Sequence, residues 1–365
     1  MPGVIDADTH IAESESIWEL IDEPMYPRRP VRLTVPKDTL YKDRNVFWLI
    51  DGKIFPKPVG KKGSYNLMTP SLPGQESARG GITIPCRELT DVESRLADMD
   101  RLHIETQVVY PTLFLIYLTD DVELEIALCK AYNRFLAQAC SRSRGRLKWV
   151  AVLPLRSVDA SIQEMQEAKK NGAVGLFFRG IEGALTLDNP HFFPIYRLAS
   201  SLDLSICIHT GSGAPSMLDL FDVERNSTFA HNRILPLVAF RDLVANKIPE
   251  LFPGLRFGFI EASAGWIPYL VHVLRRLVRE RWKFASSVDL FHEYRLYVAC
   301  EADEDLPYIA RYAGEDHILV GSDYGHNDPS KEPELVATMR AREDVPGTLI
   351  EKILCHNPRN FYSLQ

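Results

Sequence analysis

Short apolar runs recur along the chain and alternate with segments in which apolar residues are spaced three or four positions apart. The first pattern predicts buried β-strands, and the second predicts amphipathic helices. Uniformly apolar strands that alternate with helices are typical of a parallel sheet covered by helices, and eight such units predict a closed (β/α)8 barrel. A doubly wound open sheet is the alternative. The predicted strands are residues 3–8, 106–111, 148–153, 173–178, 204–209, 255–261, 295–300 and 317–322.

Three of the intervening segments carry clear helix signals. Thr90 and Glu93 have the spacing of a capping box, which predicts that a helix opens at Thr90. Apolar residues on one face of each helix predict the side that is buried. These faces are Val92, Leu96 and Met99; Leu124, Leu128, Ala131 and Phe135; and Val158, Ile162 and Met165.

One segment, residues 24–90, interrupts the alternation and is rich in Pro, Gly, Lys and Arg. Within it, NVFWLI and KIFPKP flank Asp51 and Gly52, a dipeptide that suits the tight turn of a β-hairpin. Because the segment leaves the barrel after the first strand, it would emerge on the face where barrel enzymes place their active sites. We therefore interpret residues 1–365 as a single barrel domain in which residues 24–90 form a lid that contacts substrate. A decorative or oligomer-forming loop is the alternative.

The composition narrows the class of partner. The chain has 365 residues and a net charge of −7, with Lys and Arg scattered among acidic residues. This distribution gives no electrostatic footprint for nucleic acid or an anionic membrane, so a small polar metabolite is the expected ligand. Six widely spaced cysteines without a CxxC pair indicate reduced core thiols of a cytoplasmic protein. The sequence shows no export signal, and no apolar stretch approaches the roughly 20 residues that span a bilayer.

Polar side chains directly follow several of the predicted strands. In a barrel the carboxyl ends of all strands meet at one mouth, so these groups would converge. Asp8 and His10 are two positions apart in the first strand and therefore face the same side, where both can reach one ion. Carboxylate oxygens mixed with imidazole nitrogens suit Zn²⁺ or Mn²⁺, and the residue types do not decide between them. The strand-end residues are Asp8, His10, Arg179, His209, Glu261, Glu301 and Asp323.

Several motifs in order along the chain point to one known family. They are DADTHIAE at the start, RLADMDRLHIETQVVYPT in the second unit, HTGSG after the fifth strand, LFPGLRFGFIEASAGWIPYL around the sixth, GSDYGH after the eighth and ILCHNPRNFYSL at the end. With these motifs the chain resembles the amidohydrolase-related branch of the metal-dependent amidohydrolase superfamily. That branch includes aminocarboxymuconate-semialdehyde decarboxylase and the resorcylate and carboxyvanillate decarboxylases. The resemblance covers most of the chain except for the lid segment.

The resemblance implies that Asp8 and His10 occupy the paired ligand positions of the first strand, with His209 the ligand of the fifth. Asp323 would be the carboxylate of the eighth strand. The chain departs from the common pattern in two places. The first ligand is usually His. The family implies Zn²⁺, but Asp8 shifts the site towards harder ions, which makes Mn²⁺ the alternative. The decarboxylases typically carry His at the sixth strand, where Glu261 could instead shuttle protons, bind the metal or be structural.

Arg179 carries a separate implication. Binuclear members of the superfamily bridge two metals with a carboxylate or a carbamylated lysine at the end of the fourth strand, and a cation there would repel a second ion. We therefore expect one divalent ion, with Arg179 holding a substrate carboxylate in a bidentate fork. Weaker candidates are Glu13 as a metal ligand, His326 as a group that binds substrate or orients Asp323, Trp266 and Tyr324 as an aromatic wall of the substrate site, and His231.

Two reactions are open to this set of groups. A hydrolase would use Asp323 to accept a proton from a metal-activated water that attacks a carbonyl-like carbon. A decarboxylase would chelate the substrate carboxylate at the metal, and Asp323 or Glu261 would protonate the carbon from which CO₂ leaves. The resemblance and Arg179 favour non-oxidative decarboxylation of a small aromatic or unsaturated carboxylic acid. A non-catalytic scaffold without metal is the third interpretation, and the family analogy adds a homodimer as an expectation.

Overall fold

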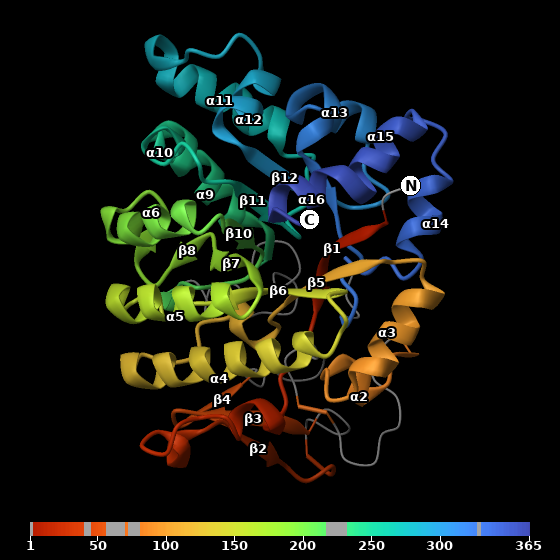
Figure 1. The fold of residues 1–365 in the computed structure, drawn as a ribbon. Helices are drawn as coiled ribbons and strands as arrows, with labels where there is room; N and C mark the ends of the chain where they lie inside the picture. The colour runs from red at the N-terminus through yellow and green to blue at the C-terminus, as the bar shows by residue number, and fades with distance from the viewer. Residues whose placement is uncertain (1–2, 40–44, 56–69, 72–80, 217–231, 327–329) are drawn as a thin grey trace.

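Eight parallel strands form the central sheet, in the order β1-β5-β6-β7-β10-β11-β12-β13 (Figure 1). The computed structural model describes residues 3–39, 45–55, 70–71, 81–216, 232–326 and 330–365. The sheet closes because the amide of Asp323 donates to the carbonyl of Asp8 at 3.1 Å, and the amide of His10 donates to the carbonyl of Tyr324 at 2.7 Å. The predicted barrel is confirmed, and each predicted strand overlaps an observed one. Their bounds are β1 (Ile5–His10), β5 (Thr106–Tyr110), β6 (Leu147–Val152), β7 (Ala173–Arg179), β10 (Ser205–His209), β11 (Phe257–Ile260), β12 (Leu296–Cys300) and β13 (Ile318–Val320).

Helices cover the outside of the barrel (Figure 1). The predicted apolar faces of α3 and α4 are fully buried, whereas in α5 Met165 is buried and Val158 and Ile162 are half-buried. The helices are α1 (Glu15–Trp18), α2 (Ile84–Arg87), α3 (Val92–Arg101), α4 (Val122–Ser141), α5 (Val158–Lys170), α6 (Phe193–Ser201), α9 (Asn232–Ala245), α10 (Ile248–Leu251), α11 (Ile267–Val278), α12 (Ser287–Tyr294), α13 (Leu306–Ala313), α14 (Leu335–Arg340), α15 (Gly347–Glu351) and α16 (Asn357–Tyr362).

The capping box predicted at the start of α3 is wrong by one residue. Asp91 is the N-cap, and its carboxylate accepts from the amide of Ser94 at 3.2 Å and from the hydroxyl of Ser94 at 2.5 Å. Thr90 instead donates its hydroxyl to the carbonyl of Pro85 at 3.3 Å. Both residue types cap helices, but a charged carboxylate is the stronger acceptor for the amides of the first turn.

Part of the predicted lid folds as an antiparallel sheet of β2 (Val31–Thr34), β3 (Val46–Ile50) and β4 (Lys53–Phe55). The hairpin predicted around Asp51 and Gly52 is confirmed. Both turn residues have positive φ, at 49° and 74°, as the primed turn of a two-residue hairpin requires. In Figure 1 this sheet lies beside α4, at the bottom of the view. Residues 40–44, 56–69 and 72–80 of the predicted lid lie outside the described part of the chain.

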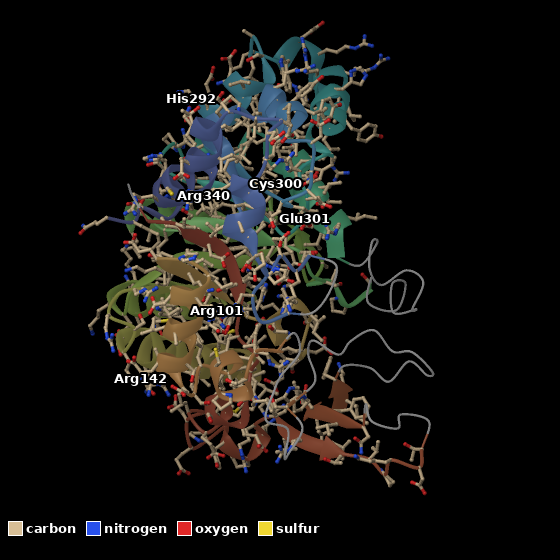
Figure 2. All side chains as sticks on the ribbon, turned by 90° about the vertical axis from the view of Figure 1, so that its right-hand side faces the viewer. Arg101, Arg142, His292, Cys300, Glu301 and Arg340 are labelled. Atoms are coloured by element: carbon tan, nitrogen blue, oxygen red, sulfur yellow. The ribbon has the colours of Figure 1, made fainter. Side chains whose placement is uncertain are left out.

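Aromatic side chains of α16 fill the N-terminal end of the barrel. Tyr362 donates its hydroxyl to the carbonyl of Ala7 at 2.7 Å and accepts from Tyr110 at 2.6 Å. Gly258 in β11 leaves room for this packing, because a Cβ there would come within 2.3 Å of the Phe361 ring. In Figure 2, Glu301 lies on the opposite side of the barrel from Arg142, the residue that follows α4. The strand-end polar residues therefore belong to the end that α16 does not fill.

Two further expectations concern the class of protein. The six cysteines are all buried and free, as core thiols would be. Within the described residues, no helix combines the length and the apolar composition needed to cross a membrane.

Candidate metal centre

Four strand ends bring polar side chains to one buried place. Asp8 and His10 come from β1, His209 from the end of β10, Glu261 follows β11 and Asp323 follows shortly after β13. Their possible ligand atoms form two overlapping groups, each within 4.8 Å. The first group is Asp8, His10, His209 and Glu261, and the second is His10, Glu261, Asp323 and His326.

The ligand atoms face one another at 3.4–3.9 Å, and the longest of these separations joins Nε2 of His10 to Oε2 of Glu261. Nε2 of His10 lies 3.4 Å from Oδ1 of Asp8 and 3.4 Å from Oδ1 of Asp323. Nε2 of His209 lies 3.5 Å from Oδ1 of Asp8 and 3.4 Å from Oε2 of Glu261. These separations exceed the 2.7–3.2 Å of normal hydrogen bonds.

These distances fit a shared metal ion. Oδ1 of Asp8 and Nε2 of His10 and His209 are buried without a hydrogen-bond partner among the described residues. Leaving such atoms unpaired is costly unless something else binds them. Tetrahedral ligand atoms at bonds of about 2.0–2.1 Å lie about 3.4 Å from one another, which is the spacing found here. The residues present therefore suit one divalent ion held by mixed oxygen and nitrogen donors.

Hydrogen bonds fix the orientation of both imidazoles. Nδ1 of His10 lies 2.9 Å from the carbonyl of Pro111, and Nδ1 of His209 lies 3.0 Å from the carbonyl of Thr210. A carbonyl only accepts, so each Nδ1 carries the proton and each Nε2 presents its lone pair to the cluster in the neutral ring. Ligand histidines in metal sites are oriented in the same way.

The two carboxylates that follow β11 and β13 stand on left-handed backbone. Glu261 and Asp323 both have a φ of 52°. This conformation is uncommon for residues other than glycine and is concentrated at functional sites. The left-handed backbone gives each side chain a direction that differs from the one it would have in a continuing strand.

The surroundings of the cluster shift the pKa values of His10 and His209 in opposite directions. Burial lowers the pKa of His209, but the carboxylates of Asp8 and Glu261 outweigh it and raise the pKa to about 9. The pKa of His10 falls well below its ordinary value, first through burial and then through the imidazoles of His326 and His209. A metal ion would thus compete with a proton for His209 but not for His10.

A chain of polar contacts leads away from Asp323. Oδ1 of Asp323 lies 2.7 Å from Nδ1 of His326, and Nε2 of His326 lies 2.8 Å from the hydroxyl oxygen of Thr112. Thr112 donates its hydroxyl proton to the carbonyl of Ile11 at 2.6 Å. The His326 ring also stacks on His10, with centroids 3.7 Å apart. His326 thus contacts Asp323, as the predicted orienting role requires, and the choice between its two predicted roles stays a prediction.

Glu13 is occupied by the backbone rather than by the cluster. Its two carboxylate oxygens accept from the amides of Thr112 and Leu113 at 2.9 and 2.8 Å. Burial raises the pKa of Glu13 to about 7, although these amide bonds lower it. The structure therefore uses Glu13 to join the loop after β1 to the loop after β5, and it belongs to neither group of possible ligands.

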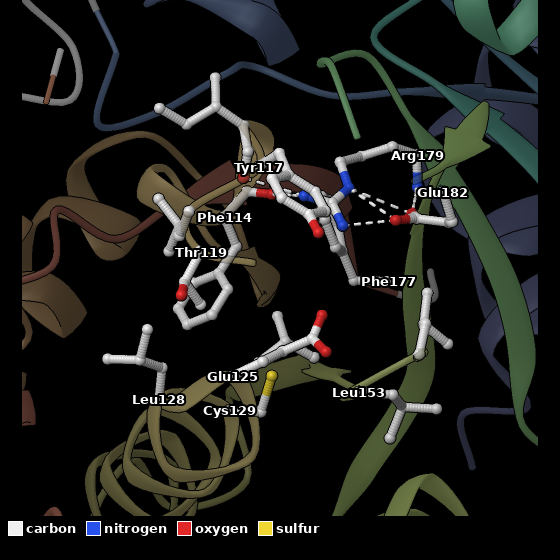
Figure 3. A pocket seen from close by; sticks show the side chains of 14 residues that line it. Phe114, Tyr117, Thr119, Glu125, Leu128, Cys129, Leu153, Phe177, Arg179 and Glu182 are labelled. Atoms are coloured by element: carbon white, nitrogen blue, oxygen red, sulfur yellow. Dashed lines mark hydrogen bonds and ion pairs between the residues drawn. The ribbon is translucent and has the colours of Figure 1, made fainter. Parts of the chain in front are cut away.

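Arg179 is already paired with groups of the protein itself (Figure 3). Its Nε donates to both oxygens of Glu182, at 3.1 and 3.0 Å, and its Nη2 bonds the same carboxylate. Its Nη1 donates to the carbonyls of Ile116 at 2.9 Å and Phe114 at 3.3 Å. The side chain is only 12% exposed. A substrate carboxylate would therefore have to replace Glu182 to be gripped as predicted.

The two predicted aromatic wall residues point away from the centre. Tyr324 donates its hydroxyl to Asp98 of α3 at 2.5 Å. Trp266 donates its indole N–H to the carbonyl of Ser263 at 2.8 Å and packs edge-on against Phe240 of α9, with centroids 5.0 Å apart. The orientation of each ring is set by a polar or aromatic partner on a helix that covers the barrel. The position of these residues next to a strand end did not predict that orientation.

Two other candidates lie outside the cluster. Glu301 accepts from Nη1 of Arg233 at 2.7 Å and forms part of a separate polar group. His231 lies outside the described residues. Thr112 and Glu182 were not predicted from the sequence. The spacing of Arg179 and Glu182 by three residues is a usable signal for their pairing.

Comparisons with known proteins agree with this architecture. Residues 83–364 match the family model described as Amidohydrolase. Gamma-resorcylate decarboxylase of Rhizobium radiobacter is 29% identical over 142 residues, 37% of this chain and 43% of that protein. The 2-amino-3-carboxymuconate-6-semialdehyde decarboxylase of Dictyostelium discoideum is 21% identical over 278 residues, 72% of this chain and 71% of that protein. The matched region spans about half the length of the resorcylate decarboxylases.

Solved structures share the fold across the whole chain. An amidohydrolase of Mycobacterium avium subsp. paratuberculosis superimposes with a TM-score of 0.71 at 18% identity, covering 100% of this chain and 98% of that one. The 5-carboxyvanillate decarboxylase of Novosphingobium aromaticivorans, in complex with manganese and 4-hydroxy-3-methoxy-5-nitrobenzoic acid, gives a TM-score of 0.70 at 17% identity, covering 100% and 96%. At these identities the likeness establishes the fold.

Proposed function

Because the chain belongs to the amidohydrolase family and is an enzyme of that family, we propose that it is a metal-dependent decarboxylase of a small aromatic or unsaturated carboxylic acid. The proposal is carried by the close approach of buried ligand atoms. Nε2 of His10 and Nε2 of His209 lie 3.4 and 3.5 Å from Oδ1 of Asp8, and Nε2 of His209 lies 3.4 Å from Oε2 of Glu261. The decarboxylases among the relatives and the shared fold support the choice of reaction.

Asp8, His10 and His209 would hold one divalent ion, with Glu261 and Asp323 at its edge. When bound, the ion supplies a Lewis acid that polarises a substrate oxygen. The donor set suits Zn²⁺, which the sequence favours, and its carboxylate-rich character also suits Mn²⁺.

The proton for the reaction is assigned to the pair of Asp323 and His326. Because Thr112 gives its only hydroxyl proton to Ile11, it must accept a proton from Nε2 of His326. Nδ1 of His326 faces Oδ1 of Asp323 at 2.7 Å, next to the ligand cluster. In the proposed function, a proton held between these two atoms is the one that the reaction uses.

In the proposed step the bond between the substrate carbon and its carboxylate breaks, and CO₂ leaves. The electron pair stays on the substrate carbon, which takes the proton from Asp323, and His326 replenishes Asp323 from solvent protons. The carboxyl group of the substrate is lost and one proton is gained, so charge and atoms balance. Asp323 acts as a general acid in this sequence, supported by its imidazole partner.

The test is CO₂ release by protein loaded with Zn²⁺ or Mn²⁺, using a panel of hydroxybenzoates and muconate-like acids. We expect release from at least one acid, and we expect chelator treatment to abolish it. Turnover of amides or esters without CO₂ release would replace this proposal with a hydrolase. Absence of any affinity for either ion, measured by elemental analysis after dialysis, would favour the scaffold interpretation.

A further inference from the structure

The seam that closes the barrel contains a side-chain pair in addition to its backbone bonds. Asp6 of β1 is fully buried, and its Oδ1 accepts from the amide of Ser322 at 2.9 Å. Its Oδ2 accepts from the hydroxyl of Ser322 at 2.5 Å. Ser322 is buried as well and lies two positions after β13, directly before Asp323. The pair therefore joins the first strand to the segment that carries Asp323, 316 positions further along the chain.

The hydroxyl of Ser322 forms hydrogen bonds in both directions. It donates to Asp6 and accepts from the amide of Tyr324 at 3.2 Å. The carbonyl of Tyr324 in turn accepts from the amide of His10 at 2.7 Å. The residues on either side of Asp323 are thus both held, and the residue that Asp6 holds is bonded to the other.

The backbone of Asp323 needs such support. Its φ of 52° lies in the left-handed region, which persists in residues other than glycine only where the surrounding contacts over-determine it. Gly321 shows how closely the segment lies against β1, because a Cβ there would come within 2.3 Å of the Cβ of Asp8. The direction of the Asp323 carboxylate therefore depends on how firmly this segment is held against the first strand.

A buried carboxylate is a costly way to close a seam. Both oxygens of Asp6 must be hydrogen-bonded, since an unpaired buried acceptor destabilises the fold. Backbone bonds already close the seam at Asp8 and His10. The side-chain pair adds a fixed point directly beside Asp323. Within the described part of the chain, neither Asp6 nor Ser322 belongs to a group of possible metal ligands.

We propose that Asp6 and Ser322 are positioning residues that act through Asp323 and hold its carboxylate at the ligand cluster. The part that this carboxylate plays as an acid rests on the proposed function, whereas its effect on a bound ion rests on the metal centre alone. Removing a hydrogen-bond partner of a group that binds metal typically costs 10–100-fold in metal affinity or activity. An effect of this size is expected here, although the pair touches no ion.

The test is a double-mutant cycle of Ser322→Ala and Asp323→Asn. The Kd of the full-length protein for Zn²⁺ is measured by competition with a chromophoric chelator. Ser322→Ala removes the hydroxyl without adding bulk, so the Kd should rise about tenfold. In the Asp323→Asn background the same substitution should change the Kd by no more than about twofold, because the group through which it acts is already lost. Ser322→Thr retains the hydroxyl and should keep the Kd within about threefold of the wild type.

Asp6 is tested in combination with Ser322. Asp6→Asn keeps the size of the side chain but removes a negative charge, so its own effect on the Kd mixes charge with position. The informative quantity is the effect of Ser322→Ala in the Asp6→Asn background. Because the two residues act as a pair, that effect should fall from about tenfold to about threefold or less.

The matched control is Ser205→Ala at the other end of the barrel. Ser205 of β10 is equally buried, and its hydroxyl also forms two bonds, donating to the carbonyl of Phe361 and accepting from Nε of Arg256 at 3.2 Å. Both alanine variants should unfold at lower urea concentrations in the metal-free form. Only Ser322→Ala should weaken Zn²⁺ binding, and for an acid that is turned over it should lower kcat about tenfold with little change in KM.

An unchanged Kd in Ser322→Ala would overturn the proposal. So would a rise of equal size in the wild-type and Asp323→Asn backgrounds, or a comparable rise in Ser205→Ala, because the effect would then not pass through Asp323. Absence of Zn²⁺ binding by the wild-type protein would overturn the metal centre and the positioning role together. The cycle requires no turnover. If it holds while no acid releases CO₂, only the proposed reaction fails, and if it fails while CO₂ is released, only the positioning role fails.

Discussion

His209 and His317 are buried at opposite ends of the barrel, and their pKa values are shifted in opposite directions. At the C-terminal end, His209 faces Asp8 and Glu261, and its pKa is raised to about 9. At the N-terminal end, His317 precedes β13 among aromatic rings, with the Tyr297 centroid 5.0 Å away, and burial followed by the charge of His292 lowers its pKa to about 4. Both rings are buried, so burial alone does not decide the charge of a histidine.

The two ends of the barrel have different tasks: the C-terminal end carries the candidate active site, and the N-terminal end stabilises the fold. Carboxylates collected at the C-terminal end keep charges and lone pairs buried at a cost in stability, as active sites do. The N-terminal end is filled by Tyr362 and Phe361 of α16, and the hydroxyl of Tyr362 is satisfied by the hydroxyl of Tyr110 and by the backbone carbonyl of Ala7. Changes at the first end should therefore alter activity, and changes at the second should alter stability.

The largest effect is expected at Asp323. Replacement by Asn keeps the size of the side chain but removes the shared proton, so CO₂ release should fall by about 10²–10⁴-fold. Metal content measured in parallel distinguishes loss of the proton from loss of the ion. The control is Asp316→Asn, an exposed acid at the other end of β13. Activity within threefold of the wild type in Asp323→Asn would contradict the assigned role.

Substitutions of Thr112 test how far activity depends on the orientation of the His326 ring. Thr112→Val preserves shape but leaves the Nε2–H of His326 without its acceptor, so kcat should fall by about 5- to 100-fold with little change in KM. Thr112→Ser restores the hydroxyl and should recover most of the activity. If Val and Ser variants behave alike, the hydroxyl does not position His326.

His317 tests the opposite end through pH. Because its folded pKa is lowered, the ring takes up a proton on unfolding, so stability falls as pH drops from 6.5 towards 4. Between pH 7 and 5.5 we expect His317→Asn to lose about 1 kcal/mol less unfolding free energy than the wild type, measured by urea denaturation. The exposed His272→Asn on α11 is the control. Activity at pH 7 should be unchanged, and identical pH profiles for wild type and variant would refute the shift.

The smallest effect is expected at the hairpin turn of the lid. Asp51→Gly tolerates the positive φ of this position while removing the bonds to Thr119 and Arg28. Partly exposed pairs of this kind contribute about 0.2–1 kcal/mol, so KM should rise about two- to fivefold with kcat unaffected. Asp22→Asn, which removes an exposed pair with Arg134, should change neither constant. A fall in kcat of tenfold would place the lid in the chemistry rather than in recognition.

The sequence predicted the barrel because each strand leaves an apolar run of recognisable length and each helix an apolar face. The cluster followed from the same pattern, since strand ends converge whenever the barrel closes. The side chains of Tyr324 and Trp266 could not be placed this way, because they follow partners on α3 and α9 that lie far away in sequence. Thr112 was missed for the same reason, as His326 lies 214 positions further along the chain.

The closure of the barrel between its first and last strands also sets when the protein can become active. Asp323, which hydrogen-bonds the strand that carries His10, is made 313 residues after His10. At 5–20 residues per second, that interval lasts about 15–60 s. During this time the nascent chain lacks the hydrogen bonds that close the barrel between β1 and the residues after β13. It also lacks Asp323 and His326 of the second ligand group. The full set of strand-end groups is therefore assembled only once Asp323 and His326 have been made.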